Sequence, residues 1–107
     1  MRVISQDGTM DFPYEISTIF IYPRIENVIA IQSAGDSEIS IIGRYSSKEK
    51  AIKAMEMLRE HNEGVIFLKT IINTEKGTSF VSCLSETDFN KLTQNYFQFP
   101  QDDEIEV

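Results

Sequence analysis

IIGRYSSKEKAIKAMEMLREH, residues 41–61, is the stretch that decides the fold, because the period of its apolar residues changes within it. Up to Tyr45 the pattern is that of a β-strand, and from Ser47 to His61 apolar residues recur at helical spacing. Ser46 and Glu49 have the spacing of a capping box, which satisfies free amides at a helix start. We expect a helix over about Ser47–His61 that ends at residues 62–64, where Gly64 suits a left-handed cap.

The residues before this helix have the composition of strands joined by turns. Ile16–Tyr22 is the strongest strand candidate, and it carries apolar side chains on both faces. Such a strand is either central in its sheet or covered by a partner subunit. Turn signals at Asp7-Gly8, 23–27 and 34–37 separate it from three further candidates. These are Arg2–Ser5, Val28–Gln32 and Ile39–Tyr45.

The residues after the helix predict further short elements. Val65–Ile72 and Ser79–Cys83 read as strands, and residues 85–92 as a short helix. Tyr96–Phe99 alternates like a last strand, which Pro100 ends. The expected class is therefore α+β, in which an antiparallel sheet from the N-terminal meander packs against the main helix. We expect a single domain over 1–101 and a solvated, frayed acidic tail over 102–107.

Length and charge limit the possible functions. The chain has 107 residues, enough for one domain, and 17 acidic against 10 basic side chains give a net charge of −7. Polymeric nucleic acid and anionic membranes are polyanions, so the overall field opposes binding to either. No apolar run reaches the length of a membrane span. The single Cys83 cannot form an internal disulfide, which favours a reducing, cytoplasmic compartment.

Residues with catalytic or metal-binding chemistry are scarce. Cys83 and His61 suggest a nucleophile and its base, but no third orienting group or oxyanion loop accompanies them. One Cys and one His lack the paired spacings of a zinc site, and the five glycines are scattered singly, so no phosphate loop is present. We expect no catalytic residues, no metal site and no cofactor.

Two arginines and several aromatic residues are the best candidates for binding. Arg24 lies in the turn after Phe20 and Tyr22, and Arg44 ends a strand just before the helix. Such arginines, together with helix amides, hold phosphate, and neighbouring rings stack a base. The alternative is that both arginines balance surface acids. Arg59 reads as an ordinary charge on the helix surface.

The aromatic cluster near the end of the chain has the same ambiguity. Alternation buries some of Tyr96, Phe97 and Phe99 in the core and leaves the rest for a ligand or a second subunit. We keep Phe97 and Phe99 as candidate ligand-stacking residues. Apolar groups on both faces of the strands favour a symmetric dimer.

Three segments together resemble a known family. MRVISQDGTMDFPYE (1–15), RYSSKEKAIKAMEMLRE (44–60) and YFQFPQDDEIEV (96–107) resemble small proteins encoded by phages and prophages of Gram-positive bacteria. That set is similar to the first-described family of Thoeris anti-defence proteins. The resemblance does not cover about 62–95, and its matching strings do not identify the family's ligand contacts.

The resemblance implies a protein that sequesters a signal without acting as an enzyme. Members of this family bind a cyclic isomer of ADP-ribose, the infection signal of Thoeris defence, without cleaving it. Related members also hold cyclic oligonucleotides at separate sites, and they are dimers or hexamers built from dimers. The resemblance further implies that the protein acts in the cytoplasm of the infected bacterial cell. Two alternatives remain: an acidic inhibitor that binds a host defence enzyme, and a hydrolase that destroys the signal.

Overall fold

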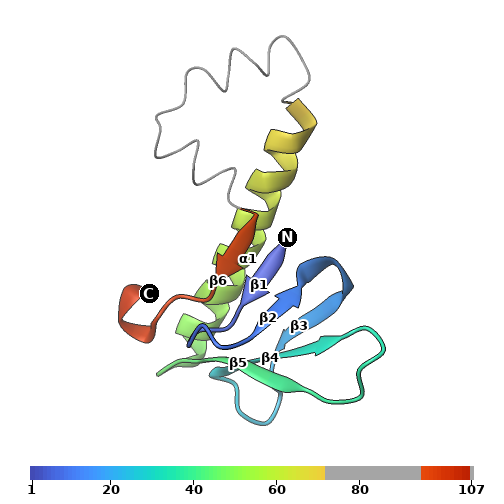
Figure 1. The fold of residues 1–107 in the computed structure, drawn as a ribbon. Coiled ribbons are helices and arrows are strands. Elements are labelled where there is room, and N and C mark those ends of the chain that lie inside the picture. Colours follow the sequence, from blue (N-terminus) through green and yellow to red (C-terminus); the bar gives the residue numbers. More distant parts are fainter. Residues whose placement is uncertain (72–94, 107) are drawn as a thin grey trace.

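The computed structural model describes the backbone of residues 1–71 and 95–106 (Figure 1). Within these residues it contains six strands, one long helix and two short 3₁₀ turns, at Tyr14–Ile16 and Asp102–Glu104. The strands and helix are β1 (Arg2–Ile4), β2 (Asp11–Pro13), β3 (Ser17–Ile21), β4 (Val28–Ser33), β5 (Ser40–Arg44), α1 (Lys48–Ile71) and β6 (Tyr96–Gln98). The strand over residues 11–13 was not expected from the sequence, and its Pro13 is tolerated because β2 lies at a sheet edge.

The strands form two sheets of three. One sheet has the order β3-β4-β5 and is antiparallel throughout, so the meander predicted from the sequence is confirmed. The other has the order β2-β1-β6, in which β2 runs antiparallel to β1 and β6 runs parallel to it. The α+β class is confirmed, with the final strand joining the first rather than extending the meander.

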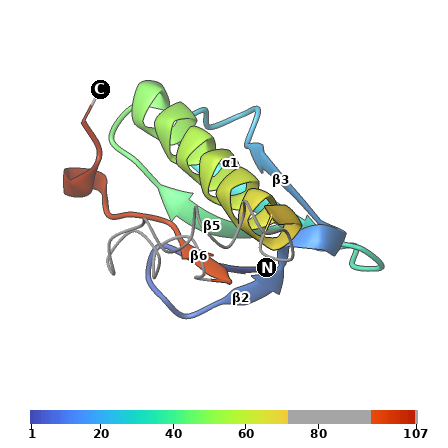
Figure 2. The same cartoon turned by 90° about the horizontal axis from the view of Figure 1, so that it is seen from above.

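The core lies where α1 crosses the sheets. Figure 2 shows the helix lying across one face of the strands. The spacing predicts a buried stripe of Ala51, Ile52, Met55 and Leu58, with Ala54 beside it. Ala51, Ala54 and Leu58 are buried and Met55 is partly buried, but Ile52 is 38% exposed, so its place in the stripe was wrong. The buried helix residues meet side chains from both sheets and from the C-terminal segment. The other buried members of this cluster are Val3, Ile29, Ile31, Ile42, Tyr45, Phe99 and Ile105.

The helix continues ten residues beyond its expected end. The predicted stop at residues 62–64 is wrong, and so is the predicted strand from Val65, since α1 runs to Ile71. Gly64 does not adopt a positive φ; among the described residues only Gly8 and Gly35 do. One helical glycine costs only about 1 kcal/mol. Val65, seven residues after Leu58, keeps the buried stripe going and is itself buried.

The start of α1 also differs from the predicted capping box. The hydroxyl of Ser47, not that of Ser46, accepts a hydrogen bond from the Lys50 amide at 3.2 Å. The Ser46 amide instead donates to the carboxylate of Asp102 at 2.7 Å. The backbone amide just before the helix therefore has its hydrogen-bond acceptor in a residue from the far end of the chain.

The acidic C-terminal segment is held against the domain as far as Ile105, contrary to the expectation of a frayed tail. Ile105 is only 4% exposed and belongs to the core. Its burial explains the order, because an acidic segment with one apolar residue facing the core has a hydrophobic anchor. The predicted strand Ser79–Cys83 and the predicted helix over 85–92 lie outside the described residues, as does Ile72 at the end of the predicted strand Val65–Ile72. Within the described part of the chain, no helix has the length and apolarity that crossing a bilayer requires.

The continuous helix predicts the sign of two glycine substitutions. Gly64→Ala is expected to raise the free energy of unfolding by about 0.5–1 kcal/mol, because alanine favours a helix interior. Gly35→Ala is the matched control and is expected to destabilise, since Gly35 has a φ of +82°. Urea unfolding measures both, and a loss of stability in Gly64→Ala would show that the helix ends there.

Candidate functional site

The outer face of the β3-β4-β5 sheet brings together three of the residues expected to bind a ligand. Ile29 and Ile31 point into the core, so Val28 and Ala30 lie on the opposite face of β4. On this face Phe20 pairs with Ala30, and Arg44 pairs with Val28. The Tyr22 amide donates to the Val28 carbonyl at 2.9 Å, which places Tyr22 across from Val28 on the other side.

The result is a shallow platform, which we call the outer platform: Phe20, Tyr22, Val28, Ala30 and Arg44. Val28 and Ala30 form its floor and are 2% and 0% exposed. The aromatic side and the arginine side are two strand spacings apart, roughly 10 Å. Figure 1 shows this sheet at the base of the molecule, with α1 rising above it. An aromatic wall, a small apolar floor and a cation at this separation suit a planar base attached to a phosphate.

Arg24 lies in the turn that joins β3 to β4, at the same end of the sheet as Arg44. Both arginines are exposed. Among the residues that the structure describes, neither takes part in an ion pair, although five other ion pairs are formed there. Their guanidinium groups therefore remain available to an anion.

Phe97 and Phe99 lie elsewhere and contact each other. Their ring centroids are 5.3 Å apart in an edge-to-face arrangement, and Phe97 also contacts the ring of His61 at 5.7 Å. Phe99 is 1% exposed and belongs to the core, while Phe97 is half-buried against it. The structure thus places these two rings in a packing cluster on β6 and α1, apart from the outer platform.

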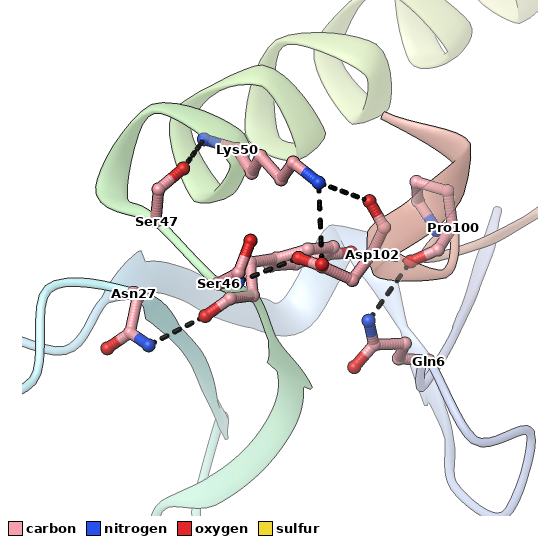
Figure 3. Close-up of polar contacts among 8 residues, drawn as sticks. Gln6, Asn27, Ser46, Ser47, Lys50, Pro100 and Asp102 are labelled. Atoms are coloured by element: carbon pink, nitrogen blue, oxygen red, sulfur yellow. Dashed lines mark hydrogen bonds and ion pairs between the residues drawn. The ribbon is translucent and has the colours of Figure 1, made fainter. Parts of the chain in front are cut away.

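The helix start near Arg44 is already occupied by the protein's own anion. Figure 3 shows the Asp102 carboxylate receiving the Ser46 amide and facing the Lys50 ammonium. Lys50 also donates to the Asp102 carbonyl at 2.8 Å. The hydrogen bond from Ser46 and the contacts with Lys50 hold the pKa of this carboxyl below its usual value. The expected convergence of Arg44 with free helix amides is therefore limited by Asp102.

Further hydrogen bonds hold residues 100–104 against the strands. We call this segment the C-terminal clasp. The carbonyl of Pro100 accepts hydrogen bonds from Tyr45 Oη at 2.9 Å and Gln6 Nε2 at 3.2 Å (Figure 3 labels Gln6 and Pro100). Burial, with added repulsion from nearby carboxylates, raises the pKa of the Tyr45 hydroxyl and keeps it a donor. Gly43 makes room for this ring, since a Cβ there would lie 3.2 Å from Tyr45 Cε2.

A concave region that the sequence did not predict lies on the other side of the sheet. A groove of about 620 Å³ lies between α1 and the segment from Tyr14 to Ile19. Its helix side presents Met55, Arg59, Asn62 and Ile66, which recur at helical spacing. That spacing is visible in the sequence, but ending the helix at His61 concealed it. Arg59 is thus more than a charge on an open helix surface.

No metal-binding cluster lies within residues 1–71 and 95–106. This part of the chain contains no group of three or more His, Cys, Asp or Glu side chains able to hold a metal ion. His61 packs against Phe97, and Cys83, its suggested partner, lies outside the described residues.

Comparison with known proteins gave no match. No family model, curated protein or solved structure is similar to this chain.

The contacts of Asp102 predict an acid-sensitive contribution to stability. A carboxyl whose folded pKa is lowered stabilises the fold above its unfolded pKa, and this stabilisation is lost as the pH falls through the folded pKa. Between neutral pH and about pH 2, wild type should therefore lose more stability than Asp102→Asn, whose amide does not titrate. Urea midpoints measured across this range test the prediction, and parallel curves for the two proteins would contradict it.

Proposed function

We propose that this protein is a phage-encoded anti-defence protein that binds and sequesters a cyclic ADP-ribose isomer without cleaving it. The observation that carries the proposal is the outer platform, where Tyr22 lies across Val28 from Arg44 and Phe20 lies beside Ala30 on the same face. The resemblance of the three sequence segments supplies the identity of the signal. The outer platform supplies aromatic rings for its base and a cation for its phosphates.

Each part of the ligand has a counterpart on the platform. Adenine stacks on Phe20 or Tyr22, an interaction of about 1–3 kcal/mol per base. The pyrophosphate pairs with Arg44, and Arg24 at the same end of the sheet supplies a second cation. These local cations have to offset the repulsive field of a protein with a net charge of −7. Stacking and ion pairing require no general base, so the signal is retained rather than hydrolysed.

A dimer would complete this binding site. The platform is an open sheet face with a buried apolar floor, whereas tight small-molecule sites enclose most of their ligand. A second copy placed over this face would enclose the ligand and cover exposed apolar groups such as Ile39, which is 48% exposed. The working form in this proposal is a homodimer, or a hexamer built from dimers, in the cytoplasm of the infected bacterial cell. Cyclic oligonucleotides are a further ligand class implied by the resemblance.

Substitution of the arginines tests the site. Arg44→Ala is expected to weaken binding of the cyclic ADP-ribose isomer at least tenfold, because a charge-assisted hydrogen bond to phosphate contributes roughly 1.5–3 kcal/mol. Arg24→Ala should weaken it in the same direction. Isothermal titration calorimetry measures the affinities. Lys53→Ala, on α1, is the matched control, since it removes the same charge and should leave binding unchanged.

The oligomeric state is measured alongside the titration, and the pattern of affinities among the variants decides where the ligand binds. Light scattering is expected to give twice the 12.3 kDa chain mass, or a multiple of it, for wild type and for both arginine variants. Unchanged affinity in both Arg24→Ala and Arg44→Ala would place the ligand elsewhere. Equal weakening by Lys53→Ala would show a general effect of net charge instead of a local site.

A further inference from the structure

The groove beside α1 has the composition of a small-molecule site and is separate from the outer platform. Its volume of about 620 Å³ lies within the range of ligand pockets, about 300–1,000 Å³. Side chains from β3 and α1 make its walls largely apolar. These are Ile19, Met55, Leu58 and Val65. Ile19 belongs to β3, whose opposite face carries Phe20, so the two regions are on opposite sides of the strand.

The charges in the groove favour an anion. The carboxylate of Glu15 is paired with the amino group of Met1, which leaves little free negative charge at this wall. Arg59 is exposed and lines the same groove. Within the part of the chain that the structure describes, no acidic side chain forms an ion pair with Arg59. The guanidinium is therefore the uncompensated charge of the groove.

The polar groups beside Arg59 are placed to share such an anion. Asn62 follows Arg59 by three residues on the helix, so their Cβ atoms are about 5–6 Å apart on one face. Its amide adds a hydrogen-bond donor next to the guanidinium fork. Tyr14 faces them from the opposite wall and offers an aromatic ring with a hydroxyl group.

We propose that this groove binds a small organic anion, with the apolar body of the ligand against Ile19 and Met55 and its anionic group on Arg59. The site does not depend on the sequestration proposed above, because none of its residues belongs to the outer platform. Apolar contact supplies most of the affinity, and the arginine selects for charge.

Two fluorescent probes with similar aromatic bodies test the site. The first is 8-anilinonaphthalene-1-sulfonate, which carries a sulfonate, and the second is N-phenyl-1-naphthylamine, which is uncharged. The folded wild-type protein is expected to bind both saturably. Arg59→Gln should weaken the sulfonate probe about tenfold and leave the neutral probe unchanged, because only the charge-assisted contact is lost.

Two more variants make the result specific to this groove. Lys53→Gln, on α1 but outside both proposed sites, is the control for charge and should leave both probes unaffected. Asn62→Trp should reduce binding of both probes by filling the groove, while circular dichroism confirms an intact fold. Absence of saturable binding to wild type would overturn the proposal. So would equal weakening of the sulfonate probe by Lys53→Gln and Arg59→Gln.

Discussion

Burial of β4 on both faces is the constraint on which the rest of the structure depends. Four consecutive residues of this strand, Val28–Ile31, are at most 2% exposed. Ile29 and Ile31 supply the core beneath α1, while Val28 and Ala30 form the floor of the outer platform. A charged residue at either inward position would remove the helix's packing partner. One at either outward position would bury an unpaired charge in the floor of the platform and would also destabilise the sheet.

A second constraint comes from the far end of the chain. Phe99 and Ile105 complete the core, and Asp102 satisfies the amide just before α1. These contacts join residues more than fifty positions apart, as the Ser46–Asp102 bond illustrates. Closing so long a loop costs conformational entropy, which the burial of two apolar side chains helps to offset. The clasp thus fixes the helix start, the end of β5 and Tyr45 together.

The sequence predicted the local elements well and the long-range contacts poorly. Period-two patterning identified β3, β4 and β5, and the stripe from Ala51 to Leu58 identified the helix, because both signals depend on neighbouring residues. The helix end was missed because Gly64 acts as a stop only when it adopts a positive φ, which its sequence alone does not reveal. The parallel pairing of β6 with β1 and the role of Asp102 depend on tertiary contacts. No local pattern carries that information.

The candidate binding residues also differ in how far local sequence patterns predict their positions. Phe20 and Tyr22 share a face because side chains alternate along a strand, which is a local property. Arg44 joins that face only because the pairing of β4 with β5 shifts register after Ile29. Strict alternation from the buried Ile42 would turn Arg44 inward. Phe97 and Phe99 were grouped with them only through residue type, and the fold places those rings in a packing cluster.

Whether the outer platform retains its ligand intact is the central functional question. The protein would be incubated with the cyclic ADP-ribose isomer, freed of unbound ligand, and denatured, and the released molecule would be identified by mass spectrometry. Sequestration predicts intact cyclic signal in amounts stoichiometric with the protein. A linearised product would show an enzyme, and the absence of any released ligand would contradict a sponge.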